Sequence, residues 1–378
     1  MQEVNLRAAY GSVACAVGLL LSANVYAFDP IMVGDNQIQI SGFIQADAIY
    51  SSSRSLAYAG EAILVPPTIP LDSQPGAGVS QTYFTARASR ITFSTRTPVE
   101  GTELSTRFEV DALGNDGNEV LSNSNGIRIR IAWVQLGNWG AGQNWSSFII
   151  YPSVPEQNNA SALVGNGSPL RQGAFRYTSH GFTVSLENPE TTLDSGNSPT
   201  GSDRAPDVML RYDVKGDRVS GAIVGVVRDL TDSTGDSTDM GYGISLGGAI
   251  SLTAKDQIKL VASKGAIGRF TSAGLFPDAE TTPDGDIRAL DVLALNVGIE
   301  HAWTRTVRSS VQYGYSEADN HYGSEASSKK GSSVMFSSFW NPYPQTRVGF
   351  DISRTKRETE GGEEGDLTRV QFAVRQNF

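Results

Sequence analysis

Residues 104–111 read LSTRFEVD, and the alternation in this stretch decides the fold. The odd positions are polar or charged, and most of the even positions are apolar. Side chains on a β-strand point alternately to two faces, so this segment has one polar and one apolar face. Residues 127–131 repeat the pattern with isoleucines and arginines, and residues 369–375 repeat it near the C-terminus.

Sixteen segments of this kind follow one another along the chain. They lie at residues 37–50, 82–97, 102–112, 127–137, 139–148, 171–179, 181–189, 205–215, 218–230, 239–252, 256–270, 287–303, 306–317, 330–341, 344–358 and 366–378. Most have the roughly 9–11 residues that a tilted strand needs to cross a bilayer. The pattern therefore predicts an all-β protein with many membrane-crossing strands.

The connections between these segments alternate in length. The odd-numbered ones are long: 51–81, 113–126, 149–170, 190–204, 231–238, 271–286, 318–329 and 359–365. The even-numbered ones are short, as at 98–101, 215–217 and 341–343. Short periplasmic turns and long extracellular loops are typical of outer-membrane barrels, whereas a sandwich gives no reason for the alternation. We therefore expect residues 37–378 to form a closed transmembrane antiparallel β-barrel of about sixteen strands, since closure satisfies every backbone hydrogen bond.

Aromatic residues support the barrel interpretation, because they gather near the short turns. They are Trp139, Tyr177, Tyr212, Trp303, Trp340 and Phe378. Amphipathic rings favour the membrane–water interface. Strands that are simply rich in aromatic residues are the alternative explanation.

Composition and the N-terminus agree with an exported barrel. The chain has 378 residues, 40 glycines, 19% charged residues and a net charge of −10, which argues against disorder and against a nucleic-acid partner. Residues 1–27 are predicted to be a secretory signal peptide, with Arg7, an apolar run at 13–21 and a cleavage site ending at Ala27. Residues 28–36 then form a short periplasmic segment. The single cysteine, Cys15, lies in the signal, so we expect no thiol chemistry in the mature chain.

Sixteen strands close around an aqueous lumen, so the inward row is expected to be polar. The predicted lumen residues are Gln39, Gln45, Asp47, Arg90, Arg107, Glu109, Asp111, Arg128, Arg130, Arg176, Glu187, Arg211, Asp213, Glu300 and Arg308. For each of these residues taken alone, the simplest explanation of its polar side chain is that it lies at the water-filled wall of a channel.

Five of these arginines suggest a more specific role, because they come from neighbouring predicted strands. They are Arg90, Arg107, Arg128, Arg130 and Arg176, and we call them the basic ladder. Guanidinium groups stay charged and can bind carboxylates or phosphates through two hydrogen bonds. Nearby acids neutralise part of the ladder. The prediction is an anion-preferring constriction, to which we also assign Arg211.

The third long connection, residues 149–170, is less charged and more apolar than the other loops. Such a loop can fold into the lumen and narrow it, and we expect Tyr151 and Glu156 on it to face the basic ladder. An ordinary surface loop is the alternative.

Several segments resemble the DcaP-like porins of Gram-negative outer membranes. They are residues 142–148 (GQNWSSF), 171–178 (RQGAFRYT), 185–190 (SLENPE), 265–270 (GAIGRF) and 357–367 (RETEGGEEGDL). The resemblance runs from about Gln37 to Phe378. It implies a homotrimeric sixteen-stranded channel with an inward third loop and a basic constriction for small anions, dicarboxylates among them. Two features depart from the family: no coiled coil precedes the barrel, and Gln376 stands where an aromatic residue is common.

We expect no enzyme, no metal and no cofactor. The three histidines, His180, His301 and His321, are far apart and lack metal-ligand spacing. A barrel enzyme of the lipase or protease type is one alternative, with His301 and Ser309 as candidates for a lipase, and a plugged structural or adhesive barrel is another. Calcium could bind acids in the loops, either Asp229, Asp232, Asp236 and Asp239 or Asp284 and Asp286, although a solvated surface explains them as well.

Overall fold

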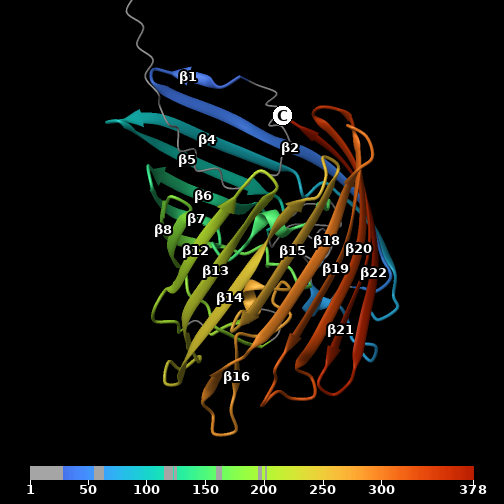
Figure 1. The fold of residues 1–378 in the computed structure, drawn as a ribbon. Helices are drawn as coiled ribbons and strands as arrows, with labels where there is room; N and C mark the ends of the chain where they lie inside the picture. Colours follow the sequence, from blue (N-terminus) through green and yellow to red (C-terminus); the bar gives the residue numbers. More distant parts are fainter. Residues whose placement is uncertain are drawn as a thin grey trace, which may run out of the picture.

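The computed structural model describes residues 29–54, 64–114, 122, 126–158, 164–194, 198–200 and 202–378. Its strands form one antiparallel barrel (Figure 1). The wall strands are β1 (Ile31–Val33), β2 (Asn36–Ser51), β3 (Gln81–Thr85), β4 (Arg90–Val99), β5 (Thr102–Asp111), β6 (Arg128–Leu136), β7 (Trp139–Trp145), β8 (Arg171–Ser179), β9 (Phe182–Glu187), β12 (Asp207–Lys215), β13 (Val219–Thr231), β14 (Thr238–Ser251), β15 (Asp256–Gly265), β18 (Val292–Ala302), β19 (Val307–Ala318), β20 (Ser328–Tyr343), β21 (Thr346–Thr359) and β22 (Glu364–Asn377). The predicted signal peptide lies outside the described residues.

The barrel closes where the first and last long strands meet. β2 pairs with β22, from Phe43 opposite Asn377 to Ser51 opposite Arg369. β3 and β4 both pair with β2 and occupy one position in the wall, and β1 only extends β2 as a short hairpin. The eighteen strands of the sheet therefore fill sixteen positions, which confirms the predicted fold class. Among the described residues, no helix is long and apolar enough to span a membrane.

Short and long connections lie at opposite ends of the barrel, as predicted. The C-terminus and β1 lie at one end, and the strand β16 (Ala279–Thr281) marks the other (Figure 1). Two of the short turns have left-handed backbones at both central residues: Glu100 (φ 44°) with Gly101 (φ 84°), and His180 (φ 50°) with Gly181 (φ 86°). Such turns match the twist of a two-residue hairpin. His180 therefore has a structural position in a tight turn.

The outer face of the barrel is apolar. Exposed outward side chains include Ile40, Ile44, Ile91, Phe93, Phe108, Leu210, Ile244, Val297, Phe336 and Phe372. Close to the short turns, the Trp139 ring lies 4.6 Å from that of Tyr177, and Phe182 lies 4.5 Å from Tyr212. An apolar band bordered by aromatic residues is the surface that a lipid bilayer requires.

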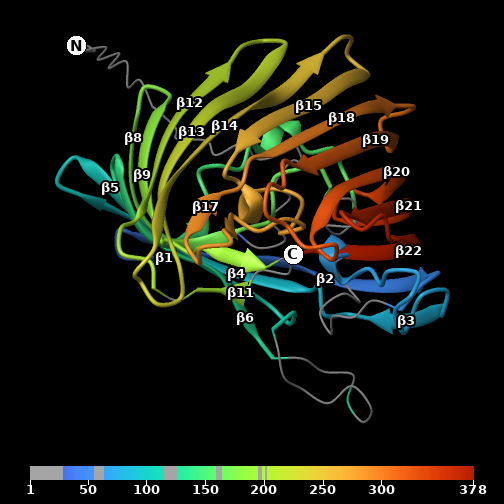
Figure 2. The ribbon, with the colours of Figure 1, turned by 90° about the horizontal axis from the view of Figure 1, so that it is seen from below.

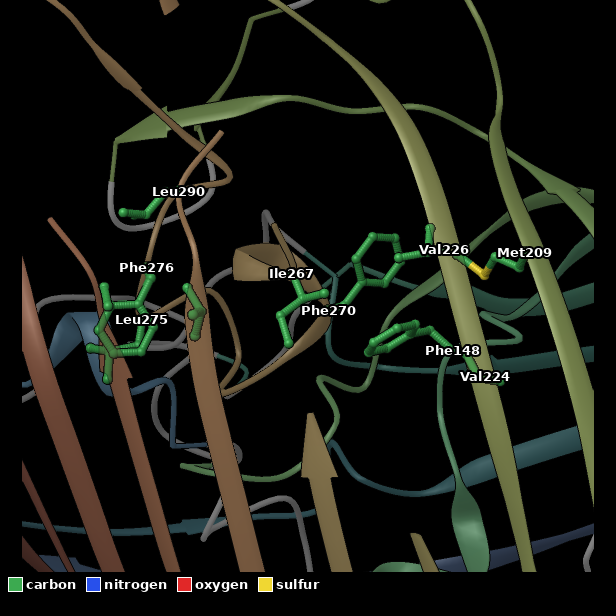
Figure 3. Packing of buried hydrophobic residues seen from close by; sticks show 11 residues of the cluster. Phe148, Met209, Val224, Val226, Ile267, Phe270, Leu275, Phe276 and Leu290 are labelled. Atoms are coloured by element: carbon green, nitrogen blue, oxygen red, sulfur yellow. The ribbon is translucent and has the colours of Figure 1, made fainter. Parts of the chain in front are cut away.

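The inner face is not polar everywhere, which corrects the prediction. On β13, the inward Ala222, Val224, Val226 and Leu230 are apolar and at most 2% exposed. They are buried because the described parts of two connections, residues 146–158 with 164–170 and residues 266–291, fold inside the barrel and pack on this wall. The resulting cluster consists of Phe148, Met209, Val224, Val226, Ile267, Phe270, Leu275, Phe276, Leu290, Val292 and Ala318 (Figure 3).

The second of these inner segments also corrects two strand boundaries. Residues 266–270 and 287–291 were expected in the wall, but β15 ends at Gly265 and β18 begins at Val292. Between them lie the 3-10 helix η4 (Gly268–Phe270) and the hairpin of β16 with β17 (Ile287–Ala289). A buried ion pair fixes the segment to the wall, since Arg228 Nη1 lies 2.6 Å from Asp278 Oδ1.

Two further predicted strands are shorter or interrupted. The strand expected at 82–97 is broken at residues 86–89, where the hydroxyl of Ser89 accepts a hydrogen bond from Gln45 N at 3.0 Å. The strand expected at 139–148 ends at Trp145, and the chain turns inward there through the 3-10 helix η3 (Tyr151–Ser153). A third short 3-10 helix, η2 (Pro66–Thr68), and the hairpin of β10 (Thr192–Asp194) with β11 (Ser198–Pro199) belong to the other long connections.

Candidate functional site

Four arginines of the basic ladder, from the adjacent strands β4, β5 and β6, surround two buried carboxylates of β5. They are Arg90, Arg107, Arg128 and Arg130 around Glu109 and Asp111. Arg130 lies between the two acids, 2.7 Å from Glu109 and 2.8 Å from Asp111. Arg107 lies 2.6 Å from Glu109, yet 48% of its side chain is exposed. Two carboxylates cannot neutralise four guanidinium groups, so this cluster, which we call the β4–β6 cluster, has an excess of positive charge.

A β-bulge in β6 lies at Arg130 and changes which residues of this strand point inward. Glu109 pairs with Ile131 and Val110 pairs with Ile129, so Arg130 is an extra residue on its strand. A bulge shifts the alternation by one residue. Consequently Ile131 points inward and is 3% exposed, although strict alternation places it outside. Arg128 and Arg130, two residues apart on the strand, both bind Asp111.

Arg176 and Arg211 hold the inner segment 146–170 in place. The Arg176 Nη2 donates to the carbonyl of Trp145 at 2.9 Å. The Arg211 Nη1 donates to the carbonyls of Ser147 and Ile149 at 2.9 and 2.8 Å. Each arginine also pairs with an acid on its own wall. The structure therefore places these two outside the β4–β6 cluster, as anchors for the segment.

Tyr151 lies close to the basic ladder. Its ring meets the Trp145 ring edge-on, with centroids 5.2 Å apart, and the Arg130 guanidinium lies 5.4 Å from the same indole. Arg171, which the sequence analysis did not single out, lies 4.6 Å from it. Burial raises the pKa of Tyr151 well above its ordinary value, so the hydroxyl stays neutral. Among the described residues, that hydroxyl has no hydrogen-bond partner.

Glu156 does not face the basic ladder, and that expectation is wrong. Its carboxylate binds Arg308 on β19, with 2.6 Å between Oε1 and Nη2, and Arg347 on β21, at 3.3 Å. Burial acts to raise the pKa of Glu156, but the hydrogen bond from Arg308 and the charges of Arg308 and Arg347 outweigh it, so the pKa lies below its ordinary value. Glu156 is therefore an ionised carboxylate at neutral pH.

Glu156 reaches this wall because segment 146–170 continues along the inside of the barrel. The Lys259 Nζ on β15 donates to the carbonyl of Val154 at 3.1 Å. Glu156 N donates to Glu300 on β18 at 2.6 Å, and Asn158 N donates to Asp351 on β21 at 2.9 Å. The view along the barrel shows this part of the chain within the ring of strands (Figure 2).

Inward-facing glycines allow this close approach. A Cβ on Gly314 of β19 would collide with the carbonyl oxygen of Val164, and a Cβ on Gly349 of β21 would collide with the Asn158 side chain. Any larger residue there would push the segment away from the wall. These glycines were the signal in the sequence that could have located the path of the segment.

A second group of arginines continues the β4–β6 cluster around the wall. The Arg375 guanidinium of β22 lies 3.9 Å from the Phe43 ring, and Arg90 lies 5.2 Å from the same ring. Arg308 and Arg347 share the Phe339 ring, at 5.3 and 5.0 Å. We call the whole set the arginine belt; its members are Arg308, Arg347, Arg375, Arg90, Arg107, Arg128 and Arg130. In the strand order the centre of the belt, at β2, lies opposite β13, on which the inner segments pack.

The residues considered for a metal site and for a barrel lipase make other contacts in this structure. Within the described part of the chain, no three His, Cys, Asp or Glu side chains come together as a metal site. Asp232 instead caps its own loop by accepting from Thr234 Oγ1 at 2.7 Å. His301 contacts Asp256 at 2.7 Å, while the Ser309 hydroxyl bonds to Trp303 and Ser338. In this structure no hydrogen bond joins Ser309 to His301.

Comparisons with known proteins agree with this architecture. The family described as DcaP outer membrane protein matches residues 5–378. The outer membrane channel DcaP of Acinetobacter baumannii has a similar structure, with a TM-score of 0.76 and 22% identity over 91% of this chain and 97% of that one. OmpF of Salmonella typhi, in complex with daunomycin, has a TM-score of 0.60 and 10% identity, over 93% and 100% of the two chains.

OmpT of Vibrio cholerae is another similar structure, with a TM-score of 0.58 and 10% identity over 93% of this chain and 100% of that one. A search of curated proteins gave no match. At these low identities the structural similarity establishes a shared barrel fold and no more. The family match covers nearly the whole sequence. The chain therefore belongs to the DcaP outer membrane protein family and is a sixteen-stranded channel of the outer membrane rather than an enzyme.

Proposed function

We propose that this channel prefers small anions, with dicarboxylates as the favoured class, and that segment 146–170 forms its constriction together with the arginine belt. The observation that carries the proposal is the β4–β6 cluster, in which four arginines surround two carboxylates and Arg107 is half exposed. Fixed positive charge on a low-dielectric wall raises the local concentration of anions. The net charge of −10 does not oppose this, because selectivity follows the charges that line the path.

The packing of the inner segments supports the same proposal. They pack on the apolar inner residues of β13 through the cluster around Phe270, while Arg107 and Arg308 of the arginine belt keep 48% and 35% of their side chains exposed. A dicarboxylate suits such a wall, because each carboxylate can accept two hydrogen bonds from one guanidinium group. The free hydroxyl of Tyr151 would add a neutral donor beside Arg130.

The test is the reversal potential of single channels in a planar bilayer with a KCl gradient. Wild type is expected to favour chloride, and the variant with Arg107→Gln and Arg130→Gln is expected to shift toward potassium. Arg354→Gln is a matched control, because Arg354 is 54% exposed, lies on the outward row with Phe350 and Ile352, and pairs with the partly exposed Asp366. An unchanged potential in the double variant would contradict the role of the cluster. A folded barrel that conducts no current would favour the plugged alternative.

We further propose that the working form is a homotrimer and that residues 1–27 are removed on export. Support for the trimer comes from a structural relative, since OmpT of Vibrio cholerae is described in a trimer form. Native mass spectrometry of the purified protein tests both proposals at once. It is expected to give three times the mass of residues 28–378, and a monomer of full length would contradict both.

A further inference from the structure

The second group of arginines in the belt has an unusual balance of charge. Arg347 on β21 and Arg375 on β22 are directly opposite each other in the sheet. Like charges at this position destabilise a strand pair unless an anion lies between them. Arg308 approaches from β19 and shares the Phe339 ring with Arg347. Three guanidinium groups thus gather on one patch of the inner wall.

One carboxylate, Glu156, binds this patch, and it comes from the inner segment. It contacts Arg308 and Arg347, but within the described structure Arg375 has no carboxylate at ion-pair distance. Arg375 donates instead to the side-chain oxygen of Gln45 at 2.7 Å. Arg347 is 13% exposed, and its Nε and Nη2 have no hydrogen-bond partner among the described residues. Buried guanidinium donors without partners are costly.

From this geometry we propose that Arg308, Arg347 and Arg375 form a carboxylate-binding subsite, and that Glu156 is a resident anion that a passing carboxylate solute displaces. The proposal rests on the proposed function, because it places a specific binding step in an anion channel. Glu156 binds Arg308 as a solute carboxylate would, through two hydrogen bonds. The unpartnered donors of Arg347 and the neighbouring Arg375 remain for a second carboxylate.

The position of Glu156 on a connection makes displacement feasible. Glu109 and Asp111 belong to strands and are held by the backbone ladder, whereas Glu156 lies outside any strand. Two further contacts, Glu156 N with Glu300 and Glu156 O with Ser310, hold the backbone when the carboxylate leaves. The side chain alone can therefore exchange with a solute.

The test is Glu156→Gln, which keeps the size and one acceptor but removes the charge. We would measure the succinate concentration that halves the chloride current through single channels. Loss of the resident competitor is expected to lower this concentration several-fold and to shift the KCl reversal potential toward chloride. Arg347→Gln is expected to raise it several-fold. Acetate is expected to respond less than succinate, since it fills only one half of the subsite.

Asp351→Asn is the matched control, because it also removes one inner-wall charge and weakens the hydrogen bond that this side chain accepts from Asn158 N of the segment. It leaves Arg308 and Arg347 bound to Glu156. An equal effect of both substitutions would overturn the proposal in favour of general loosening of the segment. So would an unchanged succinate block in Glu156→Gln. If wild type selects potassium, the proposed function fails, whereas the shift caused by Glu156→Gln still decides the resident-anion proposal.

Discussion

The two sides of the barrel interior differ in the kind of side chain that they carry. The inner row of β13 is largely apolar, and the described parts of residues 146–158, 164–170 and 266–291 pack on this side through the cluster around Phe270. The wall from β19 through β2 to β6 instead carries the arginine belt, which the inner segment contacts through Glu156 at Arg308 and Arg347. One side provides packing energy and the other provides charge. From this comparison we expect substitutions on the two sides to separate stability from the proposed ion selectivity.

Phe270→Ala should produce the largest effect, because it removes the centre of the apolar cluster. Phe270 is fully buried and its ring lies 5.1 Å from that of Phe148. Truncation of a buried phenylalanine costs about 3–5 kcal/mol. We expect lower thermal stability and a larger single-channel conductance, measured by melting and in bilayers. Phe372→Ala, on the lipid-facing side, is the control, and an equal loss of stability there would remove the distinction between the two faces.

Asp278→Asn should destabilise nearly as much, because it leaves Arg228 with a single carboxylate. Both Arg228 and Asp278 are buried, and the second acid, Asp207, also serves Arg269. Breaking one partner of a buried ion pair costs about 3–5 kcal/mol. The free energy of unfolding in urea measures the effect. Asp366→Asn breaks the exposed pair with Arg354 and should cost less than about 1 kcal/mol.

Gly314→Ala should displace the inner segment from the wall while the strands of the barrel stay in place. A Cβ at this position would collide with the Val164 carbonyl, and overpacking costs about 1–3 kcal/mol. We expect conductance to rise and the preference for chloride to fall. The control is Gly225→Ala on β13, where a Cβ would have 3.9 Å to its nearest atom. Unchanged conductance in Gly314→Ala would mean that the segment does not limit the current.

The smallest expected effect is on the pH dependence of selectivity. The pKa of Glu156 is lower than the ordinary value of about 4.3, because Arg308 and Arg347 outweigh its burial. Its charge, and the anchoring that it provides, are therefore present at neutral pH and are lost as the pH falls through the lowered pKa. Lys259 and Glu300 also lie near this carboxylate. Wild type and Glu156→Gln should differ in reversal potential at pH 7 and converge only below about pH 4. Convergence already at pH 6 would contradict the lowered pKa.

The sequence by itself was sufficient for the architecture of the wall. Period-two alternation at segments such as 104–111, with the regular change between short and long connections, predicted sixteen strands and a closed barrel. These signals are local, because each strand must present one face to lipid and each short turn must reverse the chain within a few residues. The basic ladder was also visible, because Arg128 and Arg130 alternate with isoleucines in the sequence and Arg107 precedes the outward Phe108.

Only the tertiary structure decided what lies inside the barrel. Four interior features depend on contacts between residues that are distant in the sequence. They are the bulge that turns Ile131 inward, the apolar inner row of β13, the inner course of residues 266–291, and the binding of Glu156 to Arg308 and Arg347. A connection has no periodic sequence pattern from which its contacts with a particular strand of the wall could be predicted. Glu156 meets its arginines more than 150 positions later in the chain because packing against β15, β18 and β19 carries it there. The sequence thus determined the wall through local periodicity, whereas contacts between distant residues decided the path of the channel.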